Sequence, residues 1–207
     1  MKIALATLAA SALALTPAAS AATIAASIAV SSTGNAANFN VTLGWAFTLE
    51  IPVLVSDLGF WDNGSNGLAG AQTVDIWTSA GVLKVTGIVP AGTAAPLLNS
   101  FRYISVTPVA LPAGSYTIGA YSNGSPDLVA ISPIITTDAA VTYAGSRSAF
   151  TSGIGFPSGD TLSAPGGNSY FGPNFQFTAT APEPASAALL GLGTLLLAAH
   201  RRRSTQA

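Results

Sequence analysis

Hydrophobic side chains in the middle of the chain recur at every second position. Between residues 47 and 60 they alternate with polar ones and then change phase by one near Ser56 and Asp57. A period of two is typical of a strand with one buried face, and the phase change indicates either one strand with a bulge or two strands that meet at a bend. Pro52 has no backbone N–H, so we expect it at a sheet edge or a strand start.

The same pattern predicts a series of further short strands. They cover residues 74–78, 82–89, 101–106, 115–121, 128–131 and 170–180. Gly, Asn and Pro clusters separate them and are typical of tight turns. Residues 136–168 are rich in Gly, Ser, Ala and Thr, and there we expect long loops with one weak strand at 140–143. The fold class predicted is all-β, a single antiparallel β-sandwich domain over residues 22–180.

The N-terminal segment has a different pattern. Lys2 is followed by the apolar residues 3–15, then by Pro17, and Ala19 and Ala21 match the small-x-small rule for cleavage. These features predict a helical signal peptide over residues 1–21. A buried N-terminal helix is the alternative, and the small residues at the cleavage position favour export.

Three features follow one another at the C-terminus: a Pro-Glu-Pro motif, an apolar run and an arginine cluster. They are formed by Pro182, Glu183 and Pro184, by residues 185–199, and by Arg201, Arg202 and Arg203. A helix over the apolar run reaches only about 22 Å, short of a hydrocarbon core of roughly 30 Å, so it predicts a marginal transmembrane helix. The arginines are expected to stop transfer and remain in the cytoplasm, which places the body of the chain outside.

This order of features resembles the PEP-CTERM sorting tail of Gram-negative bacteria over residues 181–207, although Ala181 stands where that family more often has Val. The resemblance implies a partner, the membrane protease exosortase, which recognises the motif and removes the helix. The protein would be anchored transiently in the inner membrane and then reach the cell surface or the extracellular polysaccharide matrix. A plain single-span anchor behind a proline-rich spacer is the alternative.

A second resemblance covers residues 58–121. The segments Leu58 to Asp62, Val74 to Trp77, Phe101 to Tyr103 and Leu111 to Ile118 are similar to an uncharacterised β-sandwich module of exported bacterial proteins. That module implies a fold and a role in adhesion, with no assigned chemistry.

Charged residues make up only 7% of the chain. Between residues 22 and 181, three Lys and Arg oppose seven Asp and Glu, a net charge of −4, which argues against nucleic-acid binding. The chain has no cysteine, and its one histidine, His200, follows the apolar run. Triads and histidine metal sites are thereby excluded from residues 22–180, and Lys84 lacks a Ser-x-x-Lys context. We expect an exported, non-catalytic protein without a cofactor.

Acidic residues leave two alternatives open. Paired carboxylates hydrolyse glycosides, and Asp57, Asp62 and Asp75 are the candidates, although surface positions on a sheet explain them equally well. Asp62, Asn63 and Asn66 offer oxygen ligands for Ca²⁺ on a short loop, but they lack the spacing of an EF-hand, and Asn-Gly pairs are primarily turn formers.

Aromatic residues support a further alternative, a carbohydrate-binding adhesion module. Trp61, Trp77 and Tyr121 each lie near an Asp or Asn, and flat rings with polar neighbours suit sugar binding. The competing interpretation is that both indoles fill the core. If Phe60 and Ile76 point inward, strand alternation directs Trp61 and Trp77 to the opposite face.

Overall fold

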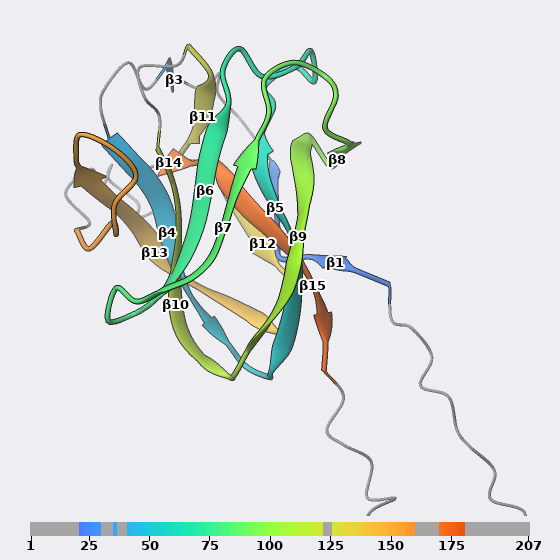
Figure 1. The fold of residues 1–207 in the computed structure, drawn as a ribbon, viewed down its shortest axis with the longest axis vertical. Helices are drawn as coiled ribbons and strands as arrows, with labels where there is room; N and C mark the ends of the chain where they lie inside the picture. Colours follow the sequence, from blue (N-terminus) through green and yellow to red (C-terminus); the bar gives the residue numbers. More distant parts are fainter. Residues whose placement is uncertain (1–20, 30–34, 37–40, 122–125, 160–169, 181–207) are drawn as a thin grey trace, which may run out of the picture.

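The described part of the chain is all-β. The computed structural model describes residues 21–29, 35–36, 41–121, 126–159 and 170–180, which contain fifteen strands and no helix (Figure 1). Every pairing between these strands is antiparallel. The predicted fold class is therefore confirmed at this level.

The strands form two large sheets and two small ones. The β5 sheet has the order β1 (Thr23–Ile24), β15 (Pro173–Ala179), β5 (Val53–Trp61), β9 (Phe101–Leu111) and β8 (Leu97–Leu98). The β4 sheet has the order β13 (Val141–Phe150), β4 (Val41–Leu49), β10 (Gly114–Tyr121), β6 (Gln72–Thr78) and β7 (Leu83–Val89). The small sheets are β14 (Tyr170–Phe171), β11 (Leu128–Ile131) and β3 (Asn35–Ala36), and β12 (Ile134–Thr137) with β2 (Ala26–Ala29).

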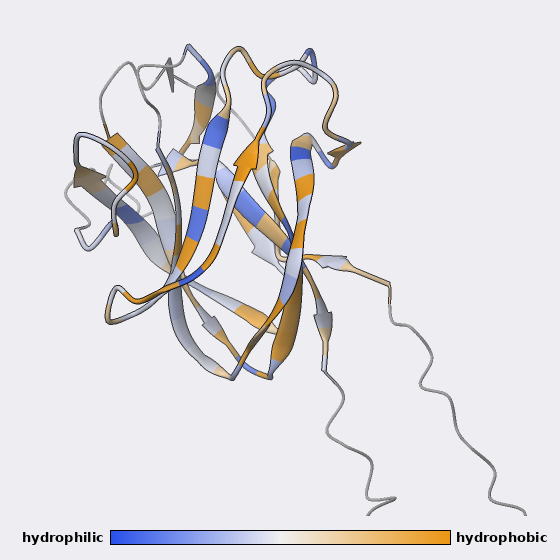
Figure 2. Cartoon of the chain, viewed as in Figure 1, coloured by the Kyte–Doolittle hydropathy of each residue, from blue (hydrophilic) through white to orange (hydrophobic). Residues whose placement is uncertain are grey.

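Aromatic side chains fill the space between the two large sheets. Phe175 of β15 lies 5.0 Å from Phe47 and 6.1 Å from Trp45 of β4, measured between ring centroids. The Trp45 indole N–H donates to the carbonyl of Pro173 at 2.8 Å, so the buried polar atom is satisfied. Hydrophobic and hydrophilic residues alternate along β6 (Figure 2), although this strand buries residues on both of its faces. The arrangement is sandwich-like.

The phase change near Ser56 is a β-bulge. The register of β5 against β15 shifts between Gln176 and Phe177, which pair with Asp57 and Val55, and this leaves Ser56 as the extra residue. The predicted stretch 47–60 is also divided between two strands, β4 and β5, but the division falls at residues 50–52 and not at Ser56. These two strands belong to different sheets. Pro52 directly precedes β5, so the strand-start alternative is correct, and the edge alternative is wrong because β5 lies between β15 and β9.

Most predicted strands are confirmed, with one region in error. The segments at 74–78, 82–89, 101–106, 115–121, 128–131 and 170–180 correspond to β6, β7, β9, β10, β11, and β14 with β15. The prediction of long loops at 136–168 is wrong in part, because this range contains the end of β12 and all ten residues of β13. Two of the positions that β13 buries are Ser146 and Ser148, so the strand carries little hydrophobic alternation.

The terminal predictions fall largely outside the described residues. These include the helices at 1–20 and 185–199 and the residues Ala19, Pro182, Glu183, Pro184, Arg201, Arg202 and Arg203. Among the residues that are described, none belongs to a helix with the length and apolar character needed to cross a membrane.

Candidate functional site

The two indoles proposed for sugar stacking are covered. Trp61 is 4% exposed and joins the hydrophobic core, and Trp77 is 5% exposed. Trp77 points away from that core, as the alternation predicts, but Phe156 packs edge-on against it at 6.0 Å. Tyr121 is half-buried at the end of β10. In the described conformation, the two indoles therefore offer little ring surface to a sugar.

The three candidate carboxylates are not brought together. Asp57 and Asp62 are five residues apart along β5 and its end, a separation of about 16 Å in extended chain. Glycosidase pairs need about 5 to 9.5 Å. Asp75 belongs to β6, in the other large sheet. This separation argues against a paired-carboxylate site made from these residues.

Asp75 is a buried carboxyl on the face of β6 opposite to Ile76. It lies between Thr86 of β7 and Gly119 of β10 in the register of the sheet. Its Oδ1 has no hydrogen-bond partner. Burial raises the pKa of Asp75, and a hydrogen bond from Thr86 offsets part of this effect. Folding thus makes the Asp75 carboxyl harder to ionise than it is in the unfolded chain.

The Asp62 carboxylate organises the loop that was considered for Ca²⁺. It forms a salt bridge with Arg102 (Nε to Oδ2, 2.8 Å) and accepts the backbone N–H of Gly67 at 2.9 Å. Asn63 and Asn66 are exposed. No group of three or more Asp, Glu, His or Cys placed to hold a metal occurs among the described residues. Because protein donors already occupy Asp62, the geometry favours the plain turn over a calcium site.

Arg102 connects this loop to the segment before β8. Its Nη1 donates to the carbonyls of Thr93 at 3.1 Å and Ala95 at 3.0 Å, and its Nη2 donates to the carbonyl of Ser65 at 3.3 Å. Arg102 was not among the site residues predicted from the sequence. Its position between Phe101 and Tyr103, in an otherwise apolar strand start, was the available signal.

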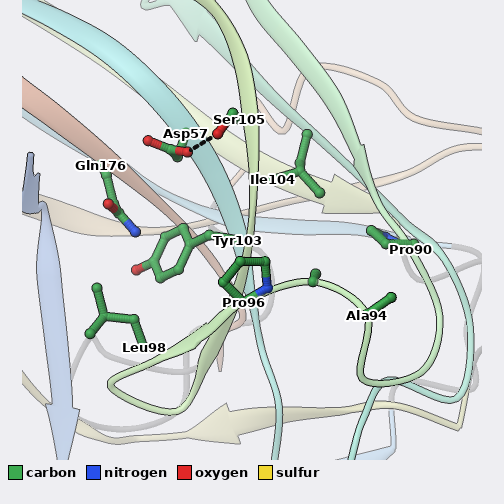
Figure 3. Close-up of a pocket in the computed structure, with 10 residues that line it drawn as sticks. Asp57, Pro90, Ala94, Pro96, Leu98, Tyr103, Ile104, Ser105 and Gln176 are labelled. Atoms are coloured by element: carbon green, nitrogen blue, oxygen red, sulfur yellow. Dashed lines mark hydrogen bonds between the residues drawn. The ribbon is translucent and has the colours of Figure 1, made fainter.

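A cleft of about 650 Å³ lies beside β9, and we call it the β9 cleft. One wall carries polar side chains from the β5 sheet, and the other is an apolar segment that leads into β8 (Figure 3). The lining residues are Asp57, Pro90, Ala94, Ala95, Pro96, Leu98, Tyr103, Ile104, Ser105 and Gln176.

Neighbouring strands bring the polar groups of the β9 cleft together. Asp57 is paired with Ser105 of β9 on one side and with Gln176 of β15 on the other. Its Oδ1 accepts the Ser105 hydroxyl and its Oδ2 accepts the Ser56 hydroxyl, each at 2.7 Å. The carboxylate is therefore held in a fixed orientation, and Figure 3 shows Tyr103 beside Gln176 on the same wall.

Tyr103 has a buried hydroxyl without a partner. The side chain is 3% exposed, and its Oη makes no hydrogen bond. Its ring lies over Gly59, where an added Cβ would come within 2.5 Å of the ring carbons. Burial, and to a lesser extent the charge of Asp57, raises the pKa of the Tyr103 hydroxyl, so it remains a neutral donor. No sequence motif indicates this site, since it depends on the pairing of distant strands.

Comparisons with known proteins leave the family open. No family model matches the chain, and neither do any of the curated proteins or solved structures. The PEP-CTERM resemblance therefore stays a prediction from the residues of the tail.

Proposed function

We propose that this chain is an exported, non-catalytic protein of the cell surface or extracellular matrix. A signal peptide at residues 1–21 exports it, residues 22–180 form its β-sandwich domain, and the PEP-CTERM tail at residues 181–207 anchors it transiently in the inner membrane. Exosortase then recognises Pro182 to Pro184 and releases the domain. The observation that carries the proposal is the fixed order of motif, apolar run and arginine cluster.

The attachment points of the two terminal segments support this proposal. Thr23 of β1 pairs with Phe177 of β15, so the described chain enters and leaves on neighbouring strands at one edge of the β5 sheet. Among the described residues, the buried core extends from Ala25 to Phe177. The lack of histidine in residues 22–180 and the separation of Asp57 from Asp62 support a non-catalytic role.

Intact mass spectrometry of the protein recovered from culture medium tests the proposal. In cells with exosortase, we expect a released product that lacks Arg201 to Arg203. In cells without it, the uncut chain should remain in the membrane fraction. Glu183→Ala should reduce release, whereas the matched control Ser186→Ala should not. A released product that retains the arginines in exosortase-containing cells would overturn the proposal.

Carbohydrate-binding adhesion is a second candidate function. It is favoured by the β9 cleft, which combines a carboxylate, an amide and hydroxyl groups with an apolar wall. This combination suits a sugar, which presents hydroxyl groups and an apolar C–H face. Binding of any polysaccharide by the full-length protein, measured on a glycan array, is the corresponding test.

A further inference from the structure

We propose that the β9 cleft binds a neutral saccharide and that Tyr103, Asp57 and Gln176 hold its hydroxyl groups. The inference rests on the carbohydrate-binding function and assigns it to residues other than Trp61 and Trp77. It does not depend on the sorting tail.

The unpartnered Tyr103 hydroxyl is the first observation that points to a ligand. A buried polar group without a hydrogen bond costs free energy, so such groups are rare in folded proteins and call for an explanation. The ring is fixed over Gly59, which holds the hydroxyl in one place beside the cleft. A ligand hydroxyl that reached this atom would supply the missing partner.

The charge of the cleft selects the class of ligand. Asp57 is the only charged residue among the described residues that line it, and no described Lys or Arg contributes. A single negative charge disfavours phosphates and acidic sugars. Each Asp57 oxygen accepts one serine hydroxyl. A carboxylate has about four acceptor positions, so it retains capacity for adjacent hydroxyls of a sugar. The Gln176 amide adds a donor that the carboxylate cannot supply.

The opposite wall supplies an apolar surface. Pro90, Ala94, Pro96 and Leu98 line it, and two of these are prolines with restricted backbone freedom. Such a wall suits the C–H face of a pyranose ring. The volume of about 650 Å³ falls within the range of roughly 300 to 1,000 Å³ that is common for small-molecule sites.

Calorimetric titration of the full-length protein tests the assignment. The protein is held in a polyoxyethylene detergent, which carries no sugar, and is titrated with neutral gluco-, galacto- and manno-oligosaccharides, with oligogalacturonate and with spermidine. We expect binding to at least one neutral oligosaccharide. Tyr103→Phe and Gln176→Ala should each weaken that binding at least tenfold.

A matched tyrosine separates ligand binding from folding. The Tyr103 hydroxyl has no protein partner, so Tyr103→Phe should leave the melting temperature of the unliganded protein unchanged or raise it. Tyr116 is also buried, but its hydroxyl donates to the carbonyl of Pro112 at 3.0 Å, and it does not line the cleft. Tyr116→Phe should therefore lower the melting temperature and leave sugar binding unchanged.

The outcomes distinguish this proposal from the function on which it rests. Neutral sugar binding that is unaffected by Tyr103→Phe and Gln176→Ala would overturn the β9 cleft assignment and keep the carbohydrate-binding function. Binding of oligogalacturonate or spermidine alone would overturn the neutral class. Absence of binding to every saccharide, on the glycan array as well, would overturn both.

Discussion

Removal of the Arg102 side chain should destabilise the fold strongly. Arg102 and Asp62 form a buried ion pair, with side chains that are 7% and 1% exposed. In Arg102→Met, the apolar part of the side chain is largely kept, and the guanidinium is lost. The Asp62 carboxylate then retains the N–H of Gly67 as its donor but has no compensating charge.

The expected magnitude follows from this uncompensated charge. Breaking a buried ion pair by removing one partner costs about 3 to 5 kcal/mol of the free energy of unfolding. The carbonyls of Ser65 and Thr93 belong to exposed residues, so water can replace the lost guanidinium donors there. Loss of these two hydrogen bonds therefore adds little to the cost. In a protein of this size, about 3 to 5 kcal/mol corresponds to a fall of roughly 6 to 20 °C in the melting temperature.

Urea and thermal unfolding, followed by tryptophan fluorescence and far-UV circular dichroism, measure this effect. Arg147→Met is the matched control, since Arg147 is half-buried and its Nη1 donates to the carbonyl of its neighbour Ser146. It should change stability by less than about 1 kcal/mol. In the double variant Asp62→Leu with Arg102→Met, the free energy of unfolding should fall by less than the sum of the decreases in the two single variants. If Arg102→Met lowers the free energy of unfolding by less than about 1 kcal/mol, a value typical of an exposed ion pair, the reasoning is refuted.

Three further substitutions test other parts of the fold. In unfolding experiments, Gly44→Ala should lower the free energy of unfolding by at least about 3 kcal/mol, because the new Cβ would lie 1.9 Å from a backbone oxygen of β10. In the control Gly153→Ala, the new Cβ meets nothing within 4 Å, so the free energy of unfolding should hardly change. Asp75→Asn should stabilise the fold by about 1 kcal/mol near pH 7. Because the folded-state pKa of Asp75 is raised, the stability from its protonated form is present below the ordinary value of 3.8 and lost as the pH rises through the raised value. The melting temperatures of wild type and variant should therefore diverge above pH 3.8. A difference that stays constant with pH would contradict this. Phe156→Ala should uncover Trp77 and shift tryptophan emission to longer wavelength, with a loss of at least about 1 kcal/mol.

Local patterns predicted the strands that have a clear division between a buried and an exposed side. The change of phase at Ser56 predicted the bulge, because a one-residue insertion moves every later side chain to the other face. The same reasoning missed the length of β13. Its Ser146 and Ser148 are buried although they are polar, so the hydropathy of the strand does not show which of its positions are covered.

Candidate sites were harder to predict than strands. The parity of Trp77 was correct, since it points away from the core that contains Ile76, but its burial depends on Phe156, almost eighty residues later in the chain. The β9 cleft joins Asp57, Ser105 and Gln176 through the register of three strands. Sequence alone identifies the polar character of each residue, and the register decides which of them meet.

The buried ion pair and the β9 cleft are parts of one arrangement. Arg102 holds the carbonyls of Thr93 and Ala95, and Ala95 belongs to the apolar wall of the cleft. A chain with so few charges thus uses two of them to fix the segment that faces Tyr103. Stability and ligand affinity should therefore fall together in Arg102→Met. Tyr103→Phe should lower ligand affinity alone, because the Tyr103 hydroxyl makes no hydrogen bond within the fold. Arg102 is on this reasoning a positioning residue, and the proposed ligand contacts lie on the opposite wall.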